Sequence, residues 1–349
     1  MATLTIVTKR TRSIFKYAAI VFGYLFIVLI LIRIGLIVKE RLIPVQIAPA
    51  SVSFGRLPPI SFPTSKTDQK FTYSIDTITG FLPVFLEQAR AHKIEEVKPQ
   101  FLALEMARQK TGRMGFRSSE TKLSENLYRW TNDIYPSREI TYNIFSRDFT
   151  LSSSFLSDPL VESFIDNFQN QDIAINAARD LMSGVAFFPD DIDIDLTKTL
   201  YYSIQDGQIN PESNITNAQL IRLDFFQKSI NGVPIYYPEV STSPINAQVV
   251  NIRNNPTVIQ ANFNYQTITT INSTYPIKTV DQAFLELKDQ KAYIASYFGE
   301  NTNILIKNVT LGYYMGEEKQ NYLMPIMIFE GNDGFFAYVS AITDEWVNR

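Results

Sequence analysis

"LGYYMGEEKQNYLMPIMIFEGNDGFFAYVSAI", residues 311–342, is the stretch that decides the fold. It is rich in aromatic and branched apolar residues, which are typical of strands. With the residues just before it, the stretch divides into three extended runs, 304–314, 322–330 and 335–342. Asp333-Gly334, between the last two runs, is a strong signal for a tight hairpin. We therefore predict three antiparallel strands here.

A helix is predicted just before these strands. Thr279 and Gln282 form a capping-box pattern, in which each side chain can satisfy the other residue's backbone N–H. The apolar side chains that follow share one helical face: Val280, Ala283, Phe284, Leu287 and Ile294. Pro325 has no N–H for a ladder, so we expect its strand to be bulged or at an edge. One helix on three strands is a compact α+β unit.

Composition excludes several classes of function. The chain has 349 residues, a net charge of −3 and a pI near 5.4, so no basic nucleic-acid footprint is present. It contains no cysteine and a single histidine, His92. Disulfides, thiolate nucleophiles and multi-histidine metal sites are therefore excluded. His92 lies among charged residues, which favours a surface imidazole.

An apolar stretch near the N-terminus, residues 17–38, predicts a single membrane-spanning helix. At about 1.5 Å per residue it would span roughly 33 Å, enough for a hydrocarbon core. Its one charge, Arg33, lies near the end and can snorkel to the interface. The basic residues before it predict a cytoplasmic N-terminus, residues 1–16, and place the bulk of the chain outside the cell membrane.

The remaining chain divides into a linker and modules. The Pro-rich segment 39–70 is expected to be an extended extracytoplasmic stalk. A membrane-proximal α+β module is expected over 71–165, and C-terminal modules over 166–349. A weak repeat supports modules: EMARQKTGRMGF (105–116) and NAARDLMSGVAF (176–187) each place Ala-Arg before a glycine and a closing Phe. Gly112 and Gly184 are expected to end the two helices.

Few residues form a pattern that is typical of catalysis or metal binding. Asp191, Asp193 and Asp195 have the spacing of the first calcium-loop ligands, but the glycine and glutamate of an EF-hand are missing. We favour a strand with these carboxylates on its solvent face and Ile192, Ile194 and Leu196 inside, and leave open whether the cluster binds a cation. The charged residues 317–319 are expected to form a solvated loop. No catalytic residue, metal ligand or cofactor is predicted.

Paired tyrosines are the candidate interface residues: Tyr236, Tyr237, Tyr313 and Tyr314. Neighbouring residues of a strand point to opposite faces, so one tyrosine of each pair can pack inside while the other lies outside. Exposed tyrosines are good anchors for a partner. The alternative is that these residues are strand formers of the core.

Two short motifs resemble a known family. NGVPIYYP (231–238) resembles the hairpin of PepSY-type domains, and YVSAITD (338–344) resembles their closing strand, with Ser340 in place of Asp and Asp344 in place of Gly. Together with LGYY and LMPIMIF, residues 219–349 and the N-terminal anchor look like the YycH/YycI family. The resemblance implies extracytoplasmic PepSY-like modules, each a helix packed on an antiparallel sheet, and contact with a membrane-bound sensor kinase, partly through the transmembrane helix.

We therefore expect an α+β, single-pass membrane protein of the bacterial cell envelope. Its expected role is non-catalytic: binding and regulating a membrane partner such as a sensor kinase or a peptidase. Two alternatives are an envelope structural or glycan-binding protein and a carboxylate-dependent hydrolase. The sequence names neither the partner nor a small-molecule ligand.

Overall fold

The computed structural model describes residues 21–33, 48–65, 69–98, 100–135, 137–155 and 164–348. The chain forms two compact units, Met1–Pro49 and Ala50–Arg349. In the first unit, the described residues 21–33 are helical. The rest of the expected span, with the expected cytoplasmic N-terminus 1–16, lies outside the described residues. Among the residues described, no helix combines the length and the apolar character that crossing a membrane requires.

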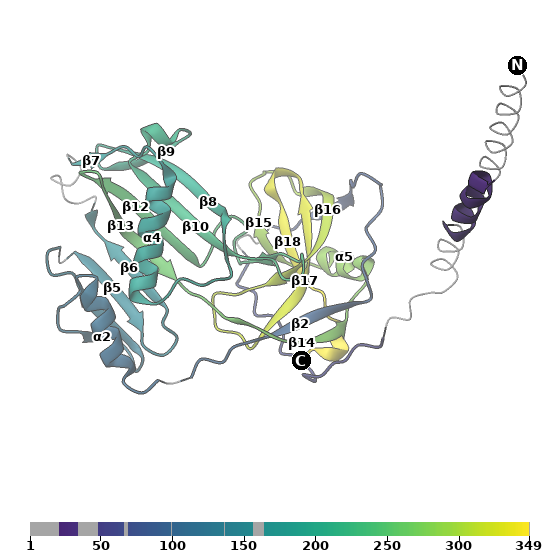
Figure 1. Ribbon diagram of the computed structural model, residues 1–349, viewed down its shortest axis with the longest axis horizontal. Coiled ribbons are helices and arrows are strands. Elements are labelled where there is room, and N and C mark those ends of the chain that lie inside the picture. The colour runs from purple at the N-terminus through teal and green to yellow at the C-terminus, as the bar shows by residue number, and fades with distance from the viewer. Residues whose placement is uncertain are drawn as a thin grey trace, which may run out of the picture. The chain divides into compact units, whose positions relative to one another are not determined.

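The second unit has a mixed α+β fold with two large, mostly antiparallel sheets among its described residues (Figure 1). The ten-stranded sheet contains, in spatial order, β3 (Thr121–Lys122), β4 (Leu127–Thr131), β5 (Arg138–Asn143), β6 (Phe149–Ser153), β13 (Asn255–Phe263), β12 (Ile245–Ile252), β10 (Leu220–Gln227), β8 (Ile192–Gln205) and β9 (Gln208–Glu212), with β7 (Ile165–Asp166) beside β12.

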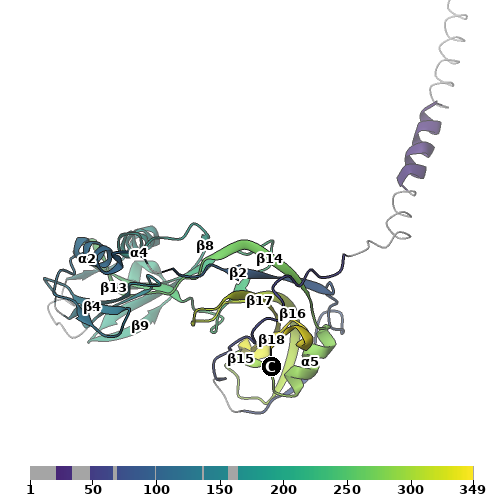
Figure 2. The same ribbon diagram turned by 90° about the horizontal axis from the view of Figure 1, so that it is seen from below.

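The eight-stranded sheet has β17 near its centre. Its order is β1 (Thr72–Ile75), β16 (Asn303–Tyr314), β17 (Tyr322–Gly331), β18 (Phe336–Ser340) and β15 (Tyr293–Ser296), with β11 (Ile235–Tyr236) on β16 and β2 (Gln88–Ile94) between β17 and β14 (Ile268–Pro276). Figures 1 and 2 show β2 and β14 side by side. The three predicted C-terminal strands are confirmed as β16, β17 and β18.

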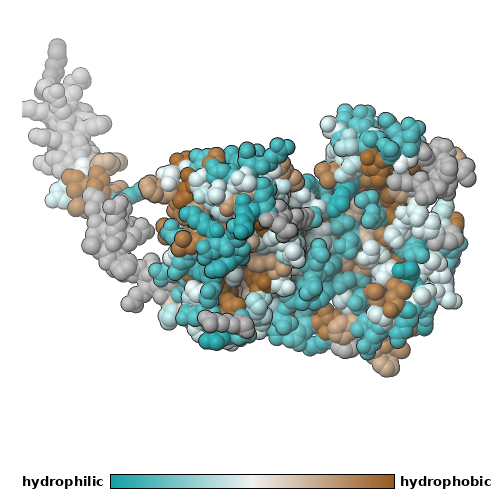
Figure 3. Space-filling model, turned by 180° about the vertical axis from the view of Figure 1, so that it is seen from behind, coloured by the Kyte–Doolittle hydropathy of each residue, from teal (hydrophilic) through white to brown (hydrophobic). Residues whose placement is uncertain are grey.

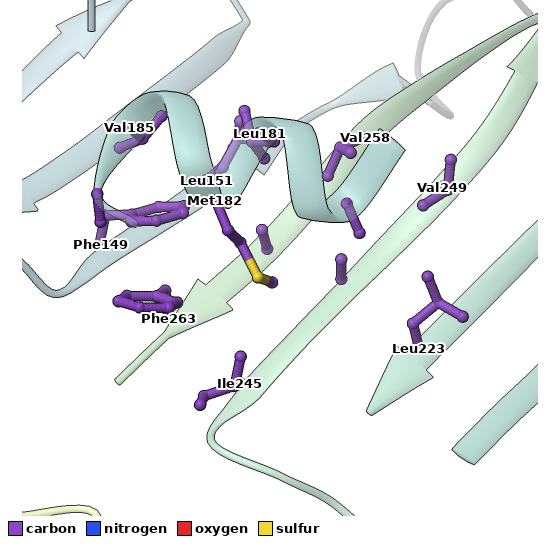
Figure 4. Packing of buried hydrophobic residues seen from close by; sticks show 14 of the residues in the cluster. Phe149, Leu151, Leu181, Met182, Val185, Leu223, Ile245, Val249, Val258 and Phe263 are labelled. Atoms are coloured by element: carbon purple, nitrogen blue, oxygen red, sulfur yellow. The ribbon is translucent and has the colours of Figure 1, made fainter. Parts of the chain in front are cut away.

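Two helices, α2 (Ala103–Arg113) and α4 (Gln171–Val185), pack on one face of the ten-stranded sheet. The repeat predicted both helices, and the matched Ala107 and Ala178 are buried against the same core. Figure 4 shows α4 laid over β12 and β13, with Met182 pointing into the apolar cluster. The expected role of the glycines is wrong, because Gly112 and Gly184 lie inside the helices. A Cβ on Gly184 would come within 2.7 Å of Met114 Sδ, so this glycine lets the segment after α2 approach α4.

The eight-stranded sheet is covered on one face by α5 (Val280–Lys288). Its capping box is confirmed: the Gln282 N–H donates to Thr279 Oγ1 at 3.2 Å, and the Thr279 N–H donates to Gln282 Oε1 at 2.9 Å. Ile294 lies in β15 rather than on the helix, although it joins the same core cluster. The helix therefore ends earlier than its apolar periodicity suggested.

Pro325 does not lie at an edge, because β17 is paired with both β16 and β18. The Tyr313 N–H points away from Pro325 and donates to the Pro234 carbonyl at 2.8 Å, so the Pro325 nitrogen faces β18. The Ala341 carbonyl on that side instead accepts from the Lys278 N–H at 2.8 Å. The ladder to β18 ends at this point, and the missing donor leaves no acceptor unpaired.

Residues 50–62 pack onto the eight-stranded sheet instead of forming a free stalk. Leu57 is fully buried, and its N–H donates to the Trp346 carbonyl at 2.8 Å. Phe62 stacks on Tyr293, with ring centroids 5.5 Å apart and planes 7° apart. We call residues 50–62 the strap. The strap belongs to the second unit because its apolar side chains complete that unit's core.

The sheets do not follow the expected modules 71–165 and 166–349. The boundary falls inside the ten-stranded sheet, because β6 pairs with β13. Conversely, β1 and β2 pair with β16 and β17 of the eight-stranded sheet. The chain thus begins the eight-stranded sheet with β1 and β2, then builds the ten-stranded sheet, and finally completes the first from β14 onward. One exception is β11, which lies between β10 and β12 in sequence but pairs with β16 of the eight-stranded sheet.

Candidate functional site: a cleft between the two sheets

A cleft of about 730 Å³ lies where the two sheets of the second unit meet. Five segments line it: the segment after β2, the β5–β6 turn, the segment after α4, the β13–β14 connection and the β16–β17 loop. The β5–β6, β13–β14 and β16–β17 connections each join two strands, and the other two segments follow the ends of β2 and α4. The side chains of the cleft are therefore presented by loops on a rigid scaffold, where binding residues are common.

Lys319 joins the two sides of the junction. Its ammonium donates to Asp148 Oδ1 at 2.8 Å, to Asn264 Oδ1 at 2.9 Å and to the Tyr265 carbonyl at 2.9 Å. Asp148 comes from the β5–β6 turn, whereas Lys319 comes from the β16–β17 loop. The expected charged surface loop is found, since Glu317, Glu318 and Lys319 are all exposed, but Lys319 in addition makes these three hydrogen bonds.

Two glutamine side chains hold the β16–β17 loop in place. The buried Gln266 donates through Nε2 to the Gly316 and Glu318 carbonyls at 3.0 and 3.2 Å and accepts from the Gln320 N–H at 2.9 Å. Gln320 in turn donates to the carbonyls of Tyr314 and Tyr322, each at 3.0 Å. The buried Gln266 amide and the half-buried Gln320 amide thus have hydrogen-bond partners in the loop backbone, and these bonds hold the loop against the β13–β14 connection.

Asp191 belongs to a polar network behind the cleft. Its carboxylate accepts from the Tyr265 hydroxyl at 3.0 Å and from Gln227 Nε2 at 2.8 Å. The Tyr237 hydroxyl donates to Gln227 Oε1 at 3.2 Å. Burial, helped by the Asp191 charge, raises the pKa of Tyr265 above its usual range. The network positions the Tyr265 ring in the cleft wall.

The expected alternation of the aspartates holds only in part. Ile192 is buried and Asp195 is exposed as expected, but Asp191 is held by hydrogen bonds, and Leu196, expected inside, is 59% exposed. The cause is a bulge: β10 pairs Asp224 with Lys198 but Phe226 with Asp193, so the intervening residues of β8 leave the register. Among the described residues, no group of three or more His, Cys, Asp or Glu side chains is placed to hold a metal ion.

His92 is buried, not a surface residue. It is 4% exposed, and its Nε2 lies 3.2 Å from the Tyr313 hydroxyl. Burial, and then the nearby Arg90 charge, lowers the pKa of His92 below its usual value. The sequence failed here because the cover of His92 comes from distant segments: His92 is paired with both Asn272 of β14 and Leu323 of β17, and its ring contacts Tyr313.

The four candidate interface tyrosines lie together around β11 and β16. Tyr313 and Tyr314 point to opposite faces of the sheet as expected, but both are buried, as is Tyr237, and Tyr236 is half-buried. Gly312 makes this packing possible, because a Cβ there would lie 2.6 Å from the Tyr236 ring. The expectation that one residue of each pair lies outside is therefore wrong for Tyr313 and Tyr314. Whether any of the four meets a partner stays a prediction.

The cleft lining mixes charge with aromatic surface. Acidic and basic side chains occur in similar number, and three half-buried rings join them; these residues are Glu95, Glu96, Asp148, Lys98, Arg147, Lys319, Phe145, Phe187 and Tyr265. Among the described lining residues, no serine or threonine hydroxyl is paired with an imidazole. The arrangement suits polar recognition of a ligand or segment. Sequence reasoning missed the cleft because its residues come from five distant segments.

Comparisons with known proteins give no family. No family model and no curated protein matches the chain. An uncharacterized protein from Eubacterium rectale is similar in structure, with a TM-score of 0.40 and 12% identity over 80% of this chain and 90% of that one. The C-terminal domain of Bacillus megaterium YpeB is similar with a TM-score of 0.32 and 13% identity over 71% and 95%. These values are too low to transfer a family or a function.

Proposed function

We propose that the chain is a membrane-anchored, extracytoplasmic, non-catalytic binding protein that regulates a membrane partner such as a sensor kinase or a peptidase. The main support for this proposal is the cleft. Its walls come from both sheets, and the Lys319–Asp148 ion pair joins them. A segment bound there would contact both sheets at once. The apolar stretch 17–38 and the resemblance to the YycH/YycI family support the membrane anchor and the regulatory role.

Regulation would follow from differential binding. A partner that binds the cleft better in one of its own states shifts that partner's equilibrium toward the bound state. An apolar anchor would raise the effective concentration of the cleft at the membrane, since both proteins are confined to the same surface. The proposal therefore needs no catalytic group.

Co-purification from native membranes tests the proposal. The full-length chain is compared with a version whose residues 17–38 are replaced by an unrelated span, and with the charge reversal Lys98→Glu in the cleft. Lys122→Glu on β3, also exposed but outside the cleft, is the matched control. We expect recovery of a membrane protein that Lys98→Glu weakens and Lys122→Glu does not. Equal recovery with both variants would remove the cleft from the proposal.

A second candidate function is glycan binding, because the rings of Phe145, Phe187 and Tyr265 line the cleft. Binding of the purified full chain to cell-wall glycan, together with no protein partner in the pull-down, would favour this role. A hydrolase is the third alternative, since Glu95, Glu96 and Asp148 also line the cleft. It is less favoured because the Asp148 carboxylate is engaged by Lys319. Turnover of a glycan that Glu96→Gln abolishes would support it.

A further inference from the structure

The loop between β1 and β2 carries an unusual set of exposed apolar side chains. Residues 77–86, TITGFLPVFL, contain no charge. Four of its large side chains extend into solvent, with exposed fractions of 105% for Ile78, 76% for Phe81, 94% for Val84 and 73% for Leu86. Single exposed apolar residues are ordinary, but four within one short loop mark an interaction surface. Figure 3 shows that hydrophobic areas interrupt the hydrophilic surface on one face of the molecule. We call residues 77–86 the apolar loop.

Packing and hydrogen bonds give the apolar loop a defined conformation. Leu82 and Phe85 turn inward and pack against the core cluster that lies under α5. Its tip is held by hydrogen bonds from the Thr77 and Thr79 hydroxyls to the Phe81 carbonyl, at 2.8 and 3.2 Å. Gly80 supplies the left-handed turn at φ +74°. The inward residues fix the loop, and the fixed loop holds its other apolar side chains in solvent.

The apolar loop ends close to the place where the second unit begins. The Glu87 carbonyl, directly after the loop, accepts from the Ile277 N–H at 3.0 Å. The Ser51 N–H donates to Thr274 Oγ1 at 2.8 Å. Thr274 and Ile277 are three residues apart along one extended segment, which is about 10 Å. The loop therefore emerges beside the start of the strap.

This position relates the apolar loop to the apolar stretch 17–38. Residue 50 follows residue 38 by about a dozen residues, which reach at most roughly 40 Å when fully extended. If the stretch lies in a bilayer, the beginning of the strap is held within that distance of the lipid surface. The apolar loop, beside the strap, is then held there as well.

We propose that the apolar loop docks on the lipid bilayer, with Ile78, Phe81, Val84 and Leu86 entering the interface. The inference rests on the membrane anchorage proposed above. A lipid surface fits better than a protein partner because the outward set is uniformly apolar and carries no charged group to orient a specific contact. Interfacial binding needs only buried apolar area close to the membrane. Docking would fix the second unit against the bilayer and orient the cleft.

Site-specific fluorescence tests the docking. Because the chain contains no cysteine, the variants Phe81→Cys and Ile134→Cys each accept a single environment-sensitive fluorophore. Ile134, in the β4–β5 turn, is 77% exposed and matches Phe81 at 76%. The full chain is reconstituted in vesicles of phosphatidylcholine with or without brominated acyl chains. We expect the label at position 81 to shift to shorter wavelength and to lose at least half its emission in brominated vesicles, and the label at 134 to change little.

The outcomes separate the loop from the anchor. Flotation with the vesicles reports anchorage: a chain that does not float contradicts the membrane proposal itself. A chain that floats while its position-81 label behaves like the position-134 label overturns lipid docking by the loop alone. A shift to shorter wavelength without quenching by bromine also overturns it, and indicates protein contact. Val84→Cys, at a second outward position, must repeat the result of Phe81→Cys.

Discussion

β5 and β17 both lie inside antiparallel sheets, yet they bury their side chains differently. In β5, Ile140 and Tyr142 are buried while their neighbours are partly exposed. In β17, every side chain from Leu323 to Phe329 is buried. The part of the ten-stranded sheet around β5 is covered by helices on one face. The eight-stranded sheet has α5 on one face. On the other face lie Tyr293, Tyr314 and Tyr338, with the strap packed against them.

The difference explains the aromatic richness of residues 311–342. A strand with one covered face reads as alternating apolar and polar residues, whereas a strand with two covered faces reads as a continuous apolar run. Tyr314 and Tyr338, with Ile326 and Ile328, form the cluster that Phe62 of the strap covers. The aromatic residues therefore build a second core layer, which is why few of them reach the surface as interface anchors.

The largest effects are expected from neighbouring residues of the two strands. The side chains of Ile328 and Phe329 point to opposite faces of β17. Ile328→Ala and Phe329→Ala should each lower the free energy of unfolding by about 2–5 kcal/mol, because each leaves a buried cavity. In β5, Ile140→Ala should do the same, but Thr141→Ala should change it by less than about 1 kcal/mol. Thermal unfolding of the full chain in detergent measures all four. A loss of less than about 1 kcal/mol for Ile328→Ala would contradict the burial of both faces of β17.

The strap can be tested at Leu57, which is fully buried. Leu57→Ala should lower the free energy of unfolding by about 2–5 kcal/mol, because it leaves a cavity in the core. The backbone of the strap is held by hydrogen bonds and cannot move in to fill that cavity. The neighbouring exposed Arg56 is the control, and Arg56→Ala should lie within about 0.5 kcal/mol of the parent chain. Equal, small losses for both variants would mean that the strap does not contribute to the core.

Tyrosine hydroxyls in the second core layer should give effects of opposite sign. Among the described residues, the buried Tyr314 hydroxyl has no hydrogen-bond partner, whereas the Tyr293 hydroxyl donates to the Pro238 carbonyl at 2.9 Å. Tyr314→Phe should therefore be neutral or raise the free energy of unfolding by about 1 kcal/mol, and Tyr293→Phe should lower it by about 1 kcal/mol. Denaturant unfolding of both variants provides the comparison, and a loss with Tyr314→Phe would reveal a partner.

The junction between the sheets should be sensitive to Lys319. Lys319→Met removes three hydrogen bonds that join the sheets, and we expect a loss of about 1 kcal/mol, since the pair with Asp148 is partly solvated. Lys291→Met is the control, because Lys291 forms an exposed pair with Asp289 in the α5–β15 connection, away from the junction. Hydrogen exchange of residues 315–321 should also increase for Lys319→Met only. Unchanged exchange would show that the glutamines alone hold the loop.

The smallest effect concerns pH and the one histidine. The folded-state pKa of His92 lies below its unfolded value, because burial disfavours the imidazolium. Its contribution to stability is then complete above about pH 6.5 and is lost as the pH falls, with a slope of at most about 1.4 kcal/mol per pH unit. His92→Gln should remove this slope between about pH 5 and 7. Denaturant unfolding of the parent chain and the variant at both pH values measures this slope. If the variant keeps the same dependence of its unfolding free energy on pH, that dependence comes from groups other than His92.

Local patterns in the sequence were enough for the helices and the C-terminal strands. The capping box at Thr279, the repeat at Ala107 and Ala178, and the turn at Asp333-Gly334 all act through neighbours in the chain, so each can be recognised by itself. In the hairpin, Asp333 and Gly334 both have positive φ, as that turn requires. Short-range periodicity also gave the α+β class.

Only the tertiary structure decided which of these residues meet. The cleft, the Lys319–Asp148 pair and the burial of His92 against Tyr313 each join segments more than a hundred residues apart. The strap looked like a stalk because prolines exclude a helix, but exclusion of a helix does not say whether a segment is free or packed. Hydrophobic burial is non-directional and acts between any surfaces that the fold brings together, so the pattern of one segment cannot reveal what covers it.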